Sequence, residues 1–227
     1  MNMNWLTIAL SMLLIAAGGC SSAATSPPTE QNLVVLLDMS ASTPLTDAQM
    51  LKRVRSILAQ EVQSVPVGSR IEIRTLGDDR VTVFSETFKV QNWKTKEGET
   101  KERLAQIVPA TVVRFLQGAT TNPETSLHGE SALTNGIYDA TKICGGQCVV
   151  LYLTDGFQNT RNGVHYPSES NKPLKPIPGL DLSRMKVRMV GVGGGSETDP
   201  DTRIAIEMHW NTWLKSARAR SVAIERF

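Results

Sequence analysis

Residues 33–42 read LVVLLDMSAS, and this stretch decides the fold. Its first half is an unbroken run of valine and leucine, which contains no polar side chain. A strand that is apolar on both faces is typical of the middle of a parallel sheet. Asp38 ends the run, and Ser40 and Ser42 follow at alternate positions. We therefore predict a central strand with polar side chains gathered at its carboxyl end.

Further along the chain, apolar strand-like runs alternate with segments of helical periodicity. Such alternation predicts an α/β fold, in which helices cover both faces of a doubly wound, mostly parallel sheet. Thr46 is the candidate N-cap of the first helix, and Pro109 is expected to kink or split the second. The predicted strands are 148–153, 185–192 and 221–227, and the predicted helices are 47–65, 100–118, 132–143 and 201–219.

One pair of strands is expected to be antiparallel. Ile71 and Ile73 alternate with charged residues, and a second strand-like run, VTVFSETF, begins at Val81. The Gly77–Asp79 turn between them suits a hairpin. We place this hairpin at an edge of the sheet.

Composition narrows the classes of function. The chain has 227 residues, of which 41% are hydrophobic and 20% charged, and its formal net charge is +2. This length suits one α/β domain with a sizeable core. A charge this small, without a dense run of lysine and arginine, argues against nucleic acid as a partner.

The first 32 residues read as an export signal and a tether. Residues 5–17 (WLTIALSMLLIAA) are apolar but short for a membrane span, as in a signal peptide. The Ala17-Gly18-Gly19-Cys20 motif that follows resembles the lipobox of bacterial lipoproteins, which implies lipidation of Cys20. We predict a signal peptide at 1–19, a Ser/Thr/Pro-rich tether at 20–32 and one domain at 33–227. An ordinary signal cleaved near Ala24, or a short anchor, is the alternative.

The lipobox also predicts a location in the cell envelope, with the domain facing the periplasm. By analogy with Gram-negative lipoproteins, which the motif resembles, Ser21 after Cys20 favours the outer membrane over the inner one. In this oxidising compartment a disulfide between Cys144 and Cys148 is expected, and the alternatives are two free thiols or half of a metal-binding knuckle.

Three polar clusters stand at the ends of strands or at the start of a helix. They contain Asp38 with Ser40 and Ser42, then Ser131, then Asp155. In a doubly wound sheet the carboxyl ends of the strands form the ligand-binding crevice. Carboxylate and hydroxyl oxygens suit a hard cation such as Mg²⁺, with Mn²⁺ or Ca²⁺ as alternatives.

The DxSxS motif at Asp38 and the TDG motif at Asp155 resemble the metal-ion-dependent adhesion site of von Willebrand factor type A (VWA) domains. This resemblance spans residues 33–227 and implies a VWA-like fold. It implies that Asp38, Ser40, Ser42, Ser131 and Asp155 bind the metal, although Thr120 and Thr121 rival Ser131. It also implies a protein partner that presents Asp or Glu to the ion, because two carboxylates leave a divalent cation electrophilic.

The expected function is therefore a membrane-tethered binding module and not an enzyme, within an envelope assembly such as a secretion or conjugation apparatus. The long segment 159–184 follows Asp155, so His165 and Tyr166 are predicted to contact the partner. A phosphatase-like, metal-dependent hydrolase with Asp38 as nucleophile is the alternative. It lacks the second acid expected two residues later, where Ser40 stands.

Overall fold

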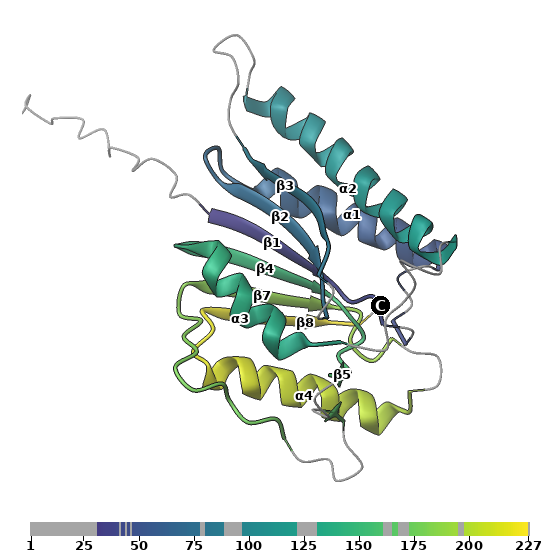
Figure 1. The fold of residues 1–227 in the computed structure, drawn as a ribbon, viewed down its shortest axis with the longest axis vertical. Helices are drawn as coiled ribbons and strands as arrows, with labels where there is room; N and C mark the ends of the chain where they lie inside the picture. Colours follow the sequence, from purple (N-terminus) through teal and green to yellow (C-terminus); the bar gives the residue numbers. More distant parts are fainter. Residues whose placement is uncertain are drawn as a thin grey trace, which may run out of the picture.

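A six-stranded sheet forms the centre of the molecule (Figure 1). The computed structural model describes residues 31–40, 42–43, 45, 47–77, 80–88, 97–121, 131–160, 165–167, 173–194 and 198–226. The predicted signal peptide, Cys20 and all but the last two residues of the predicted tether lie outside these ranges. The sheet strands are β1 (Gln31–Leu37), β2 (Arg70–Thr75), β3 (Thr82–Thr87), β4 (Gln147–Leu153), β7 (Met185–Val190) and β8 (Ser221–Glu225).

The strand order is β3-β2-β1-β4-β7-β8. Every neighbouring pair is parallel except β2 and β3, which form an antiparallel hairpin at the edge. The fold class predicted from the sequence is therefore confirmed, including its one antiparallel edge strand. The order reverses between β1 and β4, which is where doubly wound sheets bind their ligands.

Strand β1 is buried on both faces, as its unbroken apolar sequence requires. Val34 and Leu36 pack into one core, while Leu33, Val35 and Leu37 pack into the other. This alternation follows from the two-residue period of a strand, whose successive side chains point to opposite faces. Because both faces are apolar, β1 is fixed in the middle of the sheet.

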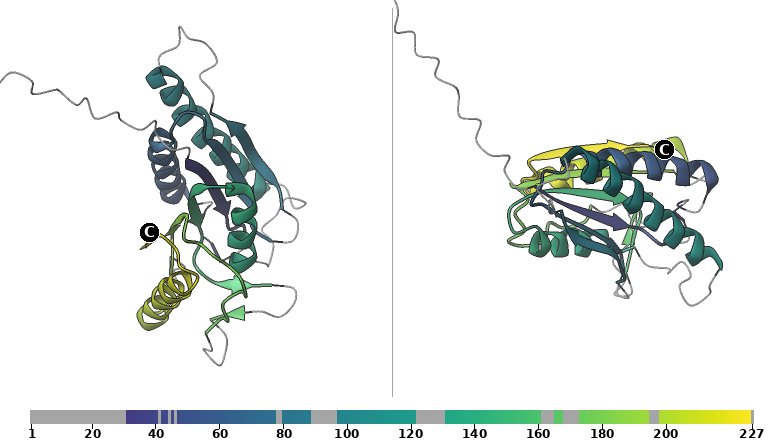
Figure 2. Two further views of the ribbon diagram at one scale, coloured as in Figure 1. Left: turned by 90° about the vertical axis from the view of Figure 1, so that its left-hand side faces the viewer. Right: turned by 90° about the horizontal axis from the view of Figure 1, so that it is seen from above.

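Helices cover the two faces in pairs. Helices α1 (Ala48–Ser64) and α2 (Glu97–Thr121) cover one face, and α3 (Leu133–Cys144) and α4 (Pro200–Ser216) cover the other. The left view of Figure 2 shows α1 and α3 on opposite sides of the sheet. None of the helices among the described residues is long and apolar enough to cross a membrane.

Two local predictions need correction. Asp47 caps α1, accepting hydrogen bonds from the backbone N–H groups of Gln49 and Met50 at 2.8 and 3.1 Å, whereas Thr46 lies outside the described residues. Pro109 does not split the second helix, because α2 is a single helix that contains it. Val108 and Val112, on either side of the proline, are fully buried. Their burial compensates for the backbone hydrogen bond that proline cannot donate.

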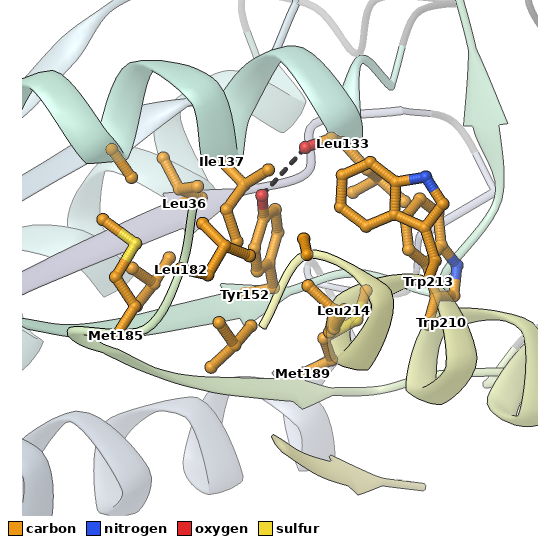
Figure 3. Packing of buried hydrophobic residues seen from close by; sticks show 14 of the residues in the cluster. Leu36, Leu133, Ile137, Tyr152, Leu182, Met185, Met189, Trp210, Trp213 and Leu214 are labelled. Atoms are coloured by element: carbon orange, nitrogen blue, oxygen red, sulfur yellow. Dashed lines mark hydrogen bonds between the residues drawn. The ribbon is translucent and has the colours of Figure 1, made fainter. Parts of the chain in front are cut away.

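The core between α3, α4 and the sheet is rich in aromatic side chains (Figure 3). The Tyr152 hydroxyl, on β4, donates a hydrogen bond of 2.8 Å to the backbone carbonyl of Leu133 at the start of α3. Trp210 and Trp213 from α4 meet edge to face, with ring centroids 5.8 Å apart. The Tyr152 hydrogen bond holds the first turn of α3 in place over β4, the strand that leads to Asp155.

Candidate metal centre

The loop after β1 is folded around the Asp38 carboxylate. The backbone N–H of Asp38 donates to the Leu153 carbonyl at 2.9 Å, which ties the end of β1 to the end of β4. The Ser40 N–H donates to Asp38 Oδ1 at 3.0 Å, so the chain turns sharply after the strand. This turn brings Ser40 Oγ to within 3.3 Å of Ser42 Oγ. The DxSxS spacing therefore places its three polar side chains on one side of a single turn.

The loop after β4 supplies the second carboxylate. Asp155 Oδ1 accepts a 3.0 Å hydrogen bond from the Phe157 N–H. Gly156 adopts a left-handed conformation with φ 86°, and a Cβ there would lie 2.7 Å from Ile206 Cγ2 on α4. The Gly156 carbonyl accepts a 2.8 Å hydrogen bond from the indole N–H of Trp210. The TDG turn is therefore held by its own backbone and by α4.

Ser131 brings the third cluster to the same place. Its hydroxyl donates a 2.7 Å hydrogen bond to Asp38 Oδ2, across 93 positions of sequence. Its backbone is fixed by an antiparallel bridge to Asn159, with N–H to carbonyl distances of 2.7 and 3.0 Å. Thr120 and Thr121 form the last turn of α2, and the structure does not describe their side chains.

The structure adds a residue that the sequence analysis did not select. The Thr154 hydroxyl donates a 2.6 Å hydrogen bond to Asp38 Oδ2 and accepts one of 3.0 Å from the Gly156 N–H. Within the described part of the chain, both Asp38 oxygens thus accept hydrogen bonds, Oδ1 from the Ser40 N–H and Oδ2 from the hydroxyls of Ser131 and Thr154. The sequence signal that could have identified Thr154 is its hydroxyl, directly before Asp155 and at the end of a strand adjacent to β1.

Burial makes this pair of carboxyl groups hard to ionise. Both side chains have no exposed surface. Burial raises the pKa of Asp38, while hydrogen bonds from Thr154 and Ser131 oppose the rise. Burial, followed by repulsion from Asp38, raises the pKa of Asp155 to about 6, and a hydrogen bond from Ser42 opposes this rise. Two buried acids side by side favour either a shared proton or an added positive charge.

The donor set fits a hard cation. All five predicted ligands offer oxygen, and Asp155 Oδ2 is buried without a hydrogen-bond partner in the part of the chain that the structure describes. A buried, unpartnered carboxylate oxygen is costly unless something binds it. Within the same described residues, no group of three or more His, Cys, Asp or Glu side chains is placed to hold a metal. We call the cluster of Asp38, Ser40, Ser42, Ser131 and Asp155 the pocket, and it combines two carboxylates with neutral hydroxyls.

The two predicted partner-contact residues have different outcomes. Tyr166 does not lie on the surface where the prediction placed it, because its side chain is only 6% exposed. Its ring stacks on His209 of α4 with centroids 3.8 Å apart, and its hydroxyl donates to the Ala205 carbonyl at 3.3 Å. His165 pairs with Asn159 through the two short strands β5 (Gln158–Asn159) and β6 (His165–Tyr166), and its side chain is not described.

The disulfide between Cys144 and Cys148 lies away from this pocket. The sulfurs of Cys144 and Cys148 are bonded, at 2.09 Å, between the end of α3 and the start of β4. This is the end of the sheet where the parallel strands begin, whereas the pocket lies where they end. The disulfide therefore fixes the turn between α3 and β4 and contributes no atom to the pocket.

Comparison with known proteins gives similarity only at the level of three-dimensional structure. No protein-family description matches the chain, and no curated protein does either. An aerotolerance-related membrane protein from Bacteroides fragilis, which carries multiple mutations to serine, is similar over 87% of this chain and 91% of its own, with 14% identity and a TM-score of 0.42. BatB from Bacteroides thetaiotaomicron is similar over 86% and 89%, with 13% identity and a TM-score of 0.43.

A VWA domain is among these similar structures. The VWA domain of SpRpn10 is similar over 87% of this chain and 88% of its own, with 10% identity and a TM-score of 0.42. At identities and TM-scores this low, the function of the chain has to come from its own residues.

Proposed function

We propose that this protein is a binding module that uses a divalent cation between Asp38 and Asp155 to engage an acidic group of a partner protein. The observation that carries the proposal is the pairing of two fully buried carboxylates from different loops, one of which has an oxygen with no hydrogen-bond partner among the residues that the structure describes. A buried pair of this kind destabilises the fold unless a cation or a proton neutralises it. A site retained at such a cost is a functional candidate.

The proposed ligands divide into charged and neutral oxygens. Asp38 and Asp155 supply the negative charge, and the hydroxyls of Ser40, Ser42 and Ser131 supply neutral oxygens. Thr154 would act through Asp38, because its hydroxyl holds the carboxylate and does not face Asp155 in any described contact. A bound cation would supply a positive charge that attracts a carboxylate from outside. Mg²⁺ is the ion we expect, because this donor set is small and consists of oxygen alone.

The geometry at Asp38 favours binding over hydrolysis. An aspartate nucleophile needs an oxygen free to attack, yet both Asp38 oxygens accept hydrogen bonds from within the protein. The side chain is also fully buried, so a substrate would have to displace those donors. We therefore infer that Asp38 organises the pocket and does not carry out catalysis.

The placement of the pocket suits a protein held at a membrane by its N-terminus. The described chain begins at Gln31, at the start of β1, and Asp38 follows the last residue of the same strand. A strand of this length spans about 20 Å, so the pocket is turned away from the end at which the chain enters the domain. We propose that Cys20 carries the lipid, in the cell envelope and preferably at the outer membrane, so that the pocket faces the periplasm.

The test combines metal binding with partner capture. Mg²⁺ should raise the melting temperature of the wild-type domain, and Asp38→Ala and Asp155→Ala should each remove that rise. Asp201→Asn is the matched control, because it removes one carboxylate at an exposed position on α4 and should leave the rise intact. Pull-down with Mg²⁺ should enrich a partner that is lost on chelation. An equal thermal response in all variants would contradict the proposal, and turnover of a phosphate ester abolished by Asp38→Ala would favour the hydrolase.

A further inference from the structure

The end of the sheet opposite the pocket carries a concentrated positive charge. Two segments, 180–186 (LDLSRMK) and 215–220 (KSARAR), contain five lysine or arginine residues and one aspartate. Their net charge of +4 exceeds the +2 of the whole chain, so the rest of the protein is net negative. We call these two segments the basic rim.

The two segments form one surface. The Leu182 N–H donates to the Ala217 carbonyl at 2.8 Å, and the Arg220 N–H donates to the Met185 carbonyl at 2.9 Å. All five basic side chains are exposed, and Asp181 pairs with Arg218 at 2.7 Å. The exposed members are Arg184, Lys186, Lys215, Arg218 and Arg220.

Arg218 occupies a backbone position that favours glycine. It lies just after the end of α4 with φ 63°, the one non-glycine residue with positive φ among the described residues. The Ala219 N–H closes the turn on the Leu214 carbonyl at 3.0 Å, as in the glycine-terminated ends of many helices. An arginine in this conformation is strained relative to glycine, which suggests that its charge is useful there.

The basic rim lies beside the place where the chain enters the domain. Gln31 on β1 pairs with Gln147 on β4, and the next residue of β4, Cys148, pairs with Met185 on β7. Arg184 directly precedes Met185, so it lies two strands away from Gln31. Adjacent strands are about 4.8 Å apart, which puts the entry point within about 15 Å of the basic rim. The Asn32 side chain also donates to the Cys144 carbonyl at 2.7 Å. Cys144 and Arg184 both line an open cleft of about 180 Å³ at this end.

We propose that the basic rim docks the domain on a membrane surface through the phosphate groups of anionic phospholipids. Ten residues lie between Cys20 and Gln31. Such a length of chain reaches at most about 40 Å, so a lipid on Cys20 would keep the rim close to the bilayer. Each basic residue near an anionic surface strengthens binding about fivefold, so a net charge of four is sufficient for measurable docking. The surface is separate from the pocket at Asp38, so either proposal can fail alone.

The experiment removes the lipid so that only the rim is tested. The mature chain from residue 20, carrying Cys20→Ser, is sedimented with vesicles of phosphatidylcholine that contain about one third phosphatidylglycerol. We expect binding to these vesicles, no binding to pure phosphatidylcholine, and weaker binding as salt is raised. The double variant Arg184→Gln/Arg220→Gln should bind about 25-fold more weakly, and Asp181→Asn about fivefold more tightly.

The matched control is Lys52→Gln/Arg55→Gln, which removes the same charge from exposed positions in the first half of α1. It should retain the affinity of the parent chain. Circular dichroism of each variant verifies folding before binding is compared. Equal loss in both double variants would show a general charge effect and overturn the proposal. Binding to both kinds of vesicle, or to neither, would overturn it as well.

Discussion

Replacing Asp155 by asparagine should make the metal-free protein more stable while abolishing its response to Mg²⁺. The carboxylate is fully buried and has one oxygen without a hydrogen-bond partner among the described residues. Asparagine keeps the carbonyl oxygen that accepts from the Phe157 N–H at 3.0 Å. It removes the charge that burial and the neighbouring Asp38 disfavour. The same substitution removes a ligand from the proposed cation site.

The size of the effect follows from the pKa. A pKa of about 6 for Asp155, in place of 3.8, corresponds to about 3 kcal/mol of destabilisation by the ionised form at neutral pH. The new amide N–H₂ enters a buried site and offsets about 1–2 kcal/mol of this gain if it finds no acceptor. The free energy of unfolding should therefore rise by about 1–2 kcal/mol, which raises the melting temperature by about 2–8 °C in a domain of this size.

The assay is thermal unfolding at pH 7, in chelator and again with excess Mg²⁺. In chelator Asp155→Asn should melt above the wild type, and with Mg²⁺ only the wild type should gain stability. A variant that melts below the wild type in chelator would show that the Asp155 carboxylate stabilises the empty fold, which would refute the electrostatic reasoning. A variant that gains as much from Mg²⁺ as the wild type would place the cation elsewhere.

Three further outcomes follow. In chelator, the free energy of unfolding of the wild type, taken relative to that of Asp155→Asn, should rise as the pH falls from 7 to 5, because the raised pKa of Asp155 makes the folded wild type bind a proton more tightly than the unfolded chain. The comparison cancels the opposite effect of His209, whose pKa burial lowers to about 4. In denaturant titrations, excess Mg²⁺ should suppress or reverse this difference. Gly136→Ala should lower the free energy of unfolding by about 1–3 kcal/mol, because the new Cβ would lie 2.4 Å from Leu76 Cδ2, whereas Gly118→Ala meets nothing within 4 Å and should be neutral or stabilising. Trp210→Phe should lower the free energy of unfolding by about 2–4 kcal/mol in the same titration and weaken Mg²⁺ binding, because it leaves the Gly156 carbonyl without its indole donor. Unchanged metal affinity would count against coupling of α4 to the Asp155 loop.

The fold was predictable because its decisive strands are short, apolar and unambiguous. The run 33–37 could pack only in the interior of a sheet, and the hairpin signal at 77–79 fixed the antiparallel edge. Element ends were less predictable, since β1 begins at Gln31 and α4 ends at Ser216, short of the predicted residue 219. Of the predicted kink or split at Pro109, the split does not occur, because local helix rules do not include the burial that holds α2 together on both sides of the proline.

The candidate site was predictable for the residues that directly follow parallel strands. Asp38 and Asp155 both follow strands that are neighbours in the sheet, so parallel pairing alone brings them together. The contact between Ser131 and Asp38 depends instead on the bridge to Asn159, which no local pattern reveals. The burial of Tyr166 could not be predicted either. A proline-rich segment is typical of a surface loop, but stacking on His209 buries this ring.

The two ends of the sheet divide the chemistry of this chain. The carboxyl ends of the strands gather buried acids, and the opposite end gathers exposed bases around the place where the chain enters. Parallel pairing imposes this polarity, because the five parallel strands all start at one end of the sheet and finish at the other. If the basic rim rests on a membrane, the strands point outward and the acidic pocket is carried to the far side of the domain. A tether at the same end as the pocket would press it against the bilayer, so the direction of β1 determines whether a partner can reach it.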